Sequence, residues 1–159
     1  KTEPARAFLR GMIAHHQQAL DMVALVRRST YGRDIREIAV RMQIAQAEEI
    51  KLMQSWLNGD VILDGDVEVV SGDQDRLMPG MLSEERMAKL RAAQGEDFDR
   101  LLLQSMIEHH EGAIEMVRVF LERFGSLGDT IVLDWFIDHI KAEQGIEVAR
   151  MSRILARLQ

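Results

Sequence analysis

Hydrophobic and polar residues follow a helical period in four stretches of the chain. In the first stretch, the residues of one helical face succeed each other at steps of three and four: Phe8, Met12, His15, Ala19, Met22 and Val26. The second stretch repeats the pattern: Ile35, Ile38, Met42, Gln46, Glu49, Met53 and Trp56. A third runs from about Ser83 to Phe124, with a bend or break expected near Gly95, and a fourth runs from about Asp129 almost to the end. The pattern predicts an all-α protein with turns at 29–33 and 125–129. Only Val67, Val69 and Val70 offer a short extended piece.

The two halves of the chain repeat each other. Residues 8–23 (FLRGMIAHHQQALDMV) and 102–117 (LLQSMIEHHEGAIEMV) are identical at eight of sixteen aligned positions, at an offset of 94. Each copy is followed by a second motif, Q-x-x-E-I/V-x-x-M, which begins at Gln46 and again at Gln144, an offset of 98. Each half is therefore one unit of two helices.

Between the halves lies a long segment that is rich in glycine and aspartate. We divide the single domain, 1–159, into repeat one (4–58), an acidic crossover linker (59–82) and repeat two (83–159). About 20 extended residues reach roughly 66 Å, whereas a helix of about 25 residues is roughly 38 Å long, so the linker can span the bundle. A four-helix bundle of two helical hairpins with one long crossover is the ferritin-like arrangement.

Composition and charge exclude several classes of protein. The net charge is −6 with acidic and basic residues interleaved, so there is no basic surface for nucleic acid. No apolar run approaches the roughly 20 residues of a membrane span. The 159 residues include no cysteine, which removes thiol catalysis and thiolate metal sites, and no other catalytic motif is present, so we expect no catalytic residues. Methionine is enriched, at ten residues.

The His-His pairs and the Q-x-x-E motifs fall at the same level when each hairpin is folded at its turn. If the halves are related by a two-fold axis, these layers converge near the middle of the bundle. Burying so many polar groups is costly unless they bind one another or an ion. The predicted metal ligands are His15, His16, His109, His110, Glu49, Glu147, Met12 and Met106. The predicted supporting residues are Gln46, Gln144, Met22, Met53, Met116 and Met151.

Two readings of this set remain open on the residues alone. Neighbouring histidines differ by about 100° around a helix, so one of each pair should point inward, and the other should lie at a helix–helix seam or support the metal ligands from behind. The set could bind a metal ion, or it could be a hydrogen-bonded network that serves packing alone. Its occurrence in both halves favours the metal. His139 stands outside the repeat and is expected at the surface or at a seam.

The motifs M-I-x-H-H-x-x-A-x-x-M and Q-x-x-E-I/V-x-x-M, with MPGM at 78–81 and FDR at 98–100, carry a family resemblance. The chain resembles the bacterial secreted proteins called domain of unknown function 305, of the ferritin-like superfamily. The resemblance implies a two-repeat bundle and a secreted or periplasmic location, with the targeting segment outside the sequence that begins at Lys1. Some relatives are similar to periplasmic copper-binding proteins.

Three functions follow from these observations as hypotheses. The first is an exported protein that binds or handles copper without turnover, because imidazole and thioether suit Cu(I). The second is an oxidase with a dinuclear iron or manganese centre, which the absence of any Glu-x-x-His motif disfavours. The third is a structural or interaction module with a satisfied polar core.

Overall fold

The computed structural model describes residues 2–30, 32–58, 77–126 and 131–158, and within these residues every regular element is a helix. The helices are α1 (Thr2–Val23), α2 (Val26–Ser29), α3 (Arg33–Leu57), α4 (Glu84–Ala92), α5 (Gly95–Phe124) and α6 (Ile131–Arg157). The all-α prediction is therefore confirmed. No helix in the described ranges is long and apolar enough to cross a membrane.

The helix ends follow the local signals of the sequence. The Ser83 side chain accepts a hydrogen bond from the Arg86 backbone N–H and so caps α4. The expected break near Gly95 is real, because Ala93 and Gln94 are extended and separate α4 from α5. Gly125 ends α5 with φ +79°, a conformation that glycine adopts without strain. Two expectations, the extended piece at 67–70 and the helix start at 129–130, lie outside the described residues.

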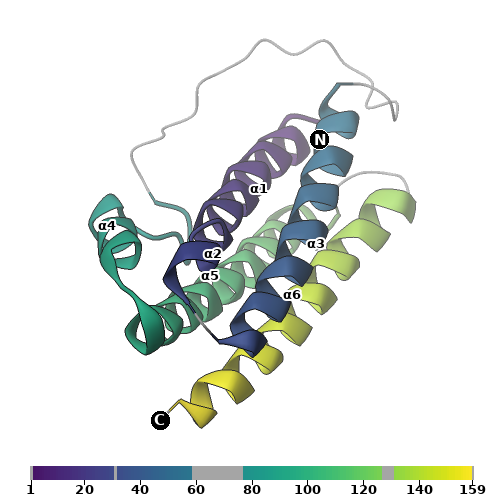
Figure 1. Ribbon diagram of the computed structural model, residues 1–159. Helices are drawn as coiled ribbons and strands as arrows, with labels where there is room; N and C mark the ends of the chain where they lie inside the picture. The colour runs from purple at the N-terminus through teal and green to yellow at the C-terminus, as the bar shows by residue number, and fades with distance from the viewer. Residues whose placement is uncertain (1, 31, 59–76, 127–130, 159) are drawn as a thin grey trace.

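The four long helices form an antiparallel bundle (Figure 1). The hairpins α1–α3 and α5–α6 each pack closely along their length. Phe8, near the start of α1, contacts Phe120, near the end of α5, with ring centroids 4.7 Å apart. Trp56, near the end of α3, contacts Phe136, near the start of α6, with ring centroids 4.6 Å apart. These contacts place the ends of α3 and α5 at the same end of the bundle. Most of the predicted crossover linker, 59–82, lies outside the described residues.

Two apolar clusters fill the bundle, and a polar layer separates them. Buried apolar residues within 5–12 of α1 belong to one cluster, and those within 19–26, at the end of α1 and the start of α2, belong to the other, with His15 and His16 between them. The same division holds on α3, α5 and α6, where the polar pair again falls between the residues of the two clusters. The buried polar residues of this layer are His15, His16, Gln46, Glu49, His109, His110, Gln144 and Glu147. The two-fold repeat of the sequence therefore becomes a two-fold arrangement of the core.

Candidate metal centre

The four histidines of the two motifs lie at one level of the bundle and are at most 1 % exposed. His15 on α1 and His109 on α5 face each other, with ring centroids 3.8 Å apart and ring planes at 39°. This contact confirms that the two His pairs share one depth. One histidine of each pair therefore points into the centre of the bundle, as expected, and all four are buried.

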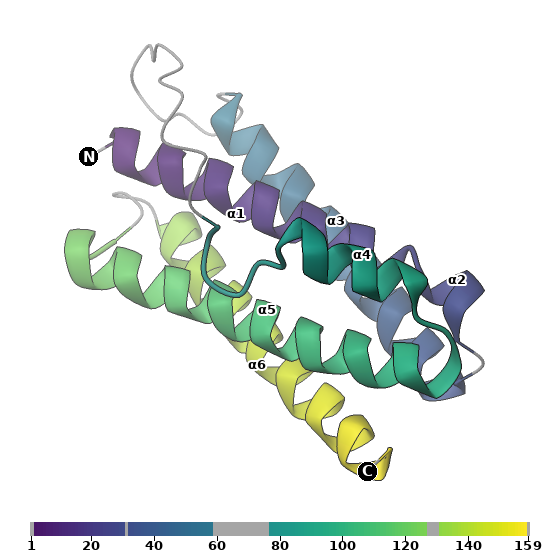
Figure 2. The same ribbon diagram turned by 90° about the vertical axis from the view of Figure 1, so that its left-hand side faces the viewer.

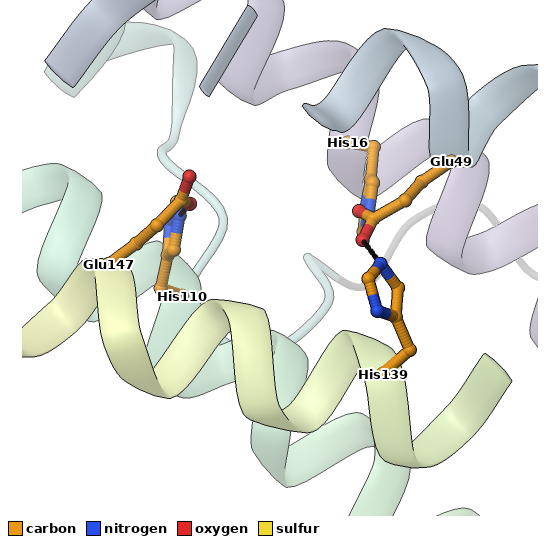
Figure 3. Close-up of polar contacts among 5 residues, drawn as sticks. All are labelled: His16, Glu49, His110, His139 and Glu147. Atoms are coloured by element: carbon orange, nitrogen blue, oxygen red, sulfur yellow. Dashed lines mark hydrogen bonds and ion pairs between the residues drawn. The ribbon is translucent and has the colours of Figure 1, made fainter. Parts of the chain in front are cut away.

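The second histidine of each pair turns toward its own hairpin partner. His16 Nε2 lies 2.7 Å from Glu49 Oε2 on α3, and His110 Nε2 lies 2.5 Å from Glu147 Oε2 on α6. Figure 3 shows the two His–Glu pairs as separate units. Both carboxylates are buried, at 5 % and 4 % exposed. The sequence placed each His pair level with its Q-x-x-E motif, and in both motifs the glutamate, rather than the glutamine, contacts the second histidine.

Each of the four imidazoles keeps one ring nitrogen without a partner among the described residues. The Nε2 atoms of His16 and His110 donate to carboxylates, and His15 Nε2 donates to the Pro79 carbonyl at 2.8 Å. The Nδ1 atoms of His15, His16 and His110 are therefore buried and have no hydrogen-bond partner among the described residues. The same holds for Nε2 of His109. A buried polar atom without a hydrogen bond costs about 1–3 kcal/mol. Four such nitrogens in one layer are better explained by a bound ligand than by a role in core packing alone.

The segment 77–82 closes one side of this layer, which the sequence did not reveal. Figure 2 shows it as the loop that leads into α4 over α1 and α5. Gln18 holds the segment through two hydrogen bonds to the Leu82 backbone, at 2.8 and 2.9 Å. Gly80 has φ +77°, and a side chain at Gly112 would come within 2.0 Å of the Pro79 oxygen. The Met-Pro-Gly-Met motif was the only signal of this docking, since it stands at the end of the predicted linker.

Methionines lie on both sides of the histidine layer. Met12, Met53 and Met116 belong to one apolar cluster, and their counterparts in the other repeat, Met106, Met151 and Met22, belong to the other. All are fully buried except Met116, which is partly buried. The segment at 77–82 adds a further sulfur, because Met78 lies against Gly11 together with the methyl group of Met116. The layer is therefore bounded by thioethers from both repeats.

Nitrogen and oxygen ligands alone do not complete a metal site here. Within residues 2–30, 32–58, 77–126 and 131–158, no three His, Asp or Glu side chains gather closely enough to hold a metal ion. The predicted supporting residues Gln46 and Gln144 are buried, and their side-chain oxygens have no hydrogen-bond partner there. An ion between His15 and His109 would need sulfur or amide ligands in addition to the imidazoles. The chemistry of the donors present, two imidazoles beside thioethers, fits a soft ion such as Cu(I).

Burial keeps the central histidines neutral at physiological pH. Desolvation lowers the pKa of His15 to about 4, opposed by its hydrogen bond to Pro79 and assisted by His16 and His110. Desolvation also lowers the pKa of His109 far below its usual value, and the other three histidines add to this. A neutral imidazole is the form that binds metal ions, so the site needs no acid–base change before binding.

These shifts predict that the metal-free protein loses stability in mild acid. The folded-state pKa of His15 lies below its unfolded value of 6.5, so between pH 6.5 and about 4 only the unfolded chain takes up the proton. The free energy of unfolding should therefore fall as the pH falls through this window, by about 2 kcal/mol at about pH 5 from His15 alone. Urea unfolding at about pH 7.5 and about pH 5 measures it.

A matched pair of variants isolates this effect from that of other titrating groups. His15→Gln should lose less stability than the parent over the same interval, whereas Met87→Leu, which removes no titrating group, should lose as much as the parent. Equal losses in the parent and in His15→Gln would show that the buried ring accepts a proton without cost.

Comparison with known proteins shows which family has this sequence and this fold. The sequence model of DUF305, a domain of unknown function, matches residues 6–155. A DUF305 protein from Streptomyces coelicolor is 30 % identical, with a TM-score of 0.81 over 97 % of this chain and 93 % of the relative. A DUF305 fragment from Deinococcus radiodurans is 28 % identical, with a TM-score of 0.79 over 97 % and 96 %.

CopM in its Cu(II)-bound form shares the fold at 22 % identity, with a TM-score of 0.75 over 98 % of this chain and 97 % of CopM. A search of curated proteins finds no match. The match over nearly the whole chain, the paired His-His motifs and the two-repeat bundle lead to one conclusion: this chain belongs to the DUF305 family.

Proposed function

We propose that this protein binds copper as Cu(I) in the layer around His15 and His109, and that it carries or stores the ion without turnover. The observation that supports this most directly is the set of four buried imidazoles, each with one ring nitrogen that lacks a hydrogen-bond partner among the described residues. A bound ion would remove the cost of burying those nitrogens.

The methionines support Cu(I) over harder ions. Met12 and Met106 lie one turn before the His pairs in the two repeats and are fully buried. Thioethers bind Cu(I) well and contribute little to Mg²⁺ or Mn²⁺. Leucine would fill a core position at least as well, so methionine at symmetry-related positions argues for a use of the sulfur.

Glu49 and Glu147 have the position of orienting groups in this proposal. A carboxylate on one ring nitrogen fixes the tautomer and direction of an imidazole and leaves the other nitrogen for a metal. His16 and His110 each have this arrangement. The two carboxylates belong to separate His–Glu pairs (Figure 3), which does not favour the dinuclear iron or manganese alternative, where carboxylates converge on two ions.

Relatives add independent support. CopM, which has this fold, is known in Cu(II)-bound, Cu(I)-bound and Ag-bound forms, at 22–24 % identity to this chain. The Streptomyces relative is described as a presumed secreted protein, and a His and Met ligand set without cysteine suits an oxidising compartment. We therefore place the proposed function outside the cytoplasm, in a secreted or periplasmic protein.

Replacing Met12 and Met106 together by leucine tests the role of sulfur. The change nearly conserves volume, so each site should lose less than about 1.5 kcal/mol of stability. We expect the Cu(I) affinity, measured by competition with a chromogenic chelator, to fall by at least about 10-fold, which is the scale for changes near a metal.

The matched control is Met87→Leu, the same change at a buried position of α4 outside the repeat. This variant should bind Cu(I) as the parent does. If the double variant also binds Cu(I) with the affinity of the parent, the methionines are ordinary core residues and the copper proposal loses its main chemical support.

A further inference from the structure

His139 is the one histidine outside the His-His motifs, and it lies on the surface of α6. Its side chain is 37 % exposed, and its ring stacks on Trp135 one turn earlier, with centroids 5.1 Å apart and planes at 15°. Trp135 is itself 56 % exposed. The stacking holds the imidazole in one orientation, with its Nε2 directed across to α3.

The atom that His139 faces is the second carboxylate oxygen of Glu49. Glu49 Oε2 is engaged by His16, whereas Oε1 is buried and has no hydrogen-bond partner in the described part of the chain. His139 Nε2 lies 3.5 Å from Oε1, as the dashed line in Figure 3 marks. This separation is long for a hydrogen bond between nitrogen and oxygen.

The same separation suits two ligands of one tetrahedral ion. Zinc binds imidazole nitrogen at about 2.0–2.1 Å and carboxylate oxygen at about 2.0–2.2 Å, so two such ligands at the tetrahedral angle are roughly 3.4 Å apart. His16 contacts Oε2, whereas His139 faces Oε1, so an ion beside Oε1 would leave the His16 contact in place.

An open groove gives this pair access to solvent. It lies between α3 and α6, has a volume of about 470 Å³, and includes among its lining residues Glu48, Glu49, Leu52, Trp135, Phe136 and His139. Glu48 places a second carboxylate on the same wall, next to Lys51, which it pairs with at 2.7 Å. Water can therefore complete the coordination of an ion that only two protein side chains hold directly.

The two-fold repeat does not reproduce this pair in the other half. At the offset of 98 that relates Glu49 to Glu147, the position of His139 corresponds to Arg41. Arg41 lines a second groove between α3 and α6 together with Arg150, Arg153 and Arg157. Asp34 and Glu37 also line that groove, but they offset only two of its four guanidinium charges, so of these two grooves the one at His139 suits a cation better.

We propose that His139 and Glu49 form a second site for a divalent cation with tetrahedral preference, of the chemical class of Zn²⁺, which shares Glu49 with the buried layer but lies on its outer side, toward the groove between α3 and α6. The site takes one imidazole nitrogen and one carboxylate oxygen from the protein and water at the remaining positions. It does not depend on copper binding at the buried layer.

Calorimetric titration of the metal-free full chain with Zn²⁺ tests this site. The background is the variant His109→Leu, in which the central pair of the buried layer is broken. We expect this variant to bind Zn²⁺, and we expect His139→Gln in the same background to lose that binding or weaken it by more than about 10-fold. Arg41→Gln is the matched control on α3, and it should bind Zn²⁺ as the background does.

Equal Zn²⁺ binding with and without His139, or no Zn²⁺ binding in the background, would overturn the proposal. A chelator competition with Cu(I) on the single variant His139→Gln separates it from the function proposed above. This variant should bind Cu(I) as the parent does, so a loss of Cu(I) binding would contradict the independence of the two sites.

Discussion

Replacing His109 by leucine should abolish most Cu(I) binding and leave the metal-free bundle folded. His109 faces His15 in the centre of the layer, and its Nε2 has no hydrogen-bond partner among the described residues. The substitution therefore removes a proposed metal ligand without breaking a hydrogen bond made by Nε2. We expect Cu(I) affinity to fall by more than about 100-fold, beyond the 10- to 100-fold effect of removing a group that only supports a ligand. Stability at about pH 7.5 should change by less than about 1.5 kcal/mol, because the two side chains have similar volumes.

The stability that His109→Leu loses on acidification provides a second measurement. Burial lowers the pKa of His109 strongly, so its removal should reduce the stability lost between about pH 7.5 and about pH 5. His139→Gln, a change at a half-buried histidine outside the His-His motifs, should leave Cu(I) affinity unchanged. Parental Cu(I) affinity combined with a loss of several kcal/mol of stability would instead identify the histidine layer as a structural network.

Replacing Gly112 by alanine should destabilise the protein by about 2–4 kcal/mol, the scale of overpacking against atoms that cannot move aside. The added carbon would lie 2.0 Å from the Pro79 oxygen and 2.6 Å from the Gly80 nitrogen, and both are backbone atoms. The segment 77–82 would have to leave α5, and His15 would then lose its Pro79 acceptor. Urea unfolding measures the loss, and faster proteolysis within 77–82 would locate it.

Gly145→Ala is the control for this change, because it makes the same substitution inside a helix where a side chain would meet no atom within 4 Å. It should stabilise the protein by about 0.5–1 kcal/mol through the higher helix propensity of alanine. A Gly112→Ala protein as stable as the parent would mean that the segment 77–82 does not pack on α5 in solution.

Local signals were enough to predict the helices and their order. The spacing of apolar residues depends only on the 3.6-residue period, so the four long helices, the turn at 29–33 and the break before Gly95 followed from it. The common depth of the two His pairs also followed, because a hairpin of known turn position fixes which residues of its two helices are level. The repeated motifs also singled out Glu49 and Glu147 as partners of the histidines, but counting along two helices is accurate to only about one turn, so it could not assign each contact.

The repeat, the helical hairpins and the polar layer across their middle could be predicted from the sequence. The closure of that layer depends on contacts between distant parts of the chain. The stacking of His15 on His109 depends on how α1 and α5 pack, and the docking of 77–82 depends on Gly80 and Gly112 meeting across 32 residues of sequence. The approach of His139 to Glu49 likewise joins two helices from different repeats. Periodicity within one helix carries no information on the rotation of that helix against a distant neighbour, because side-chain packing over the whole core sets this rotation.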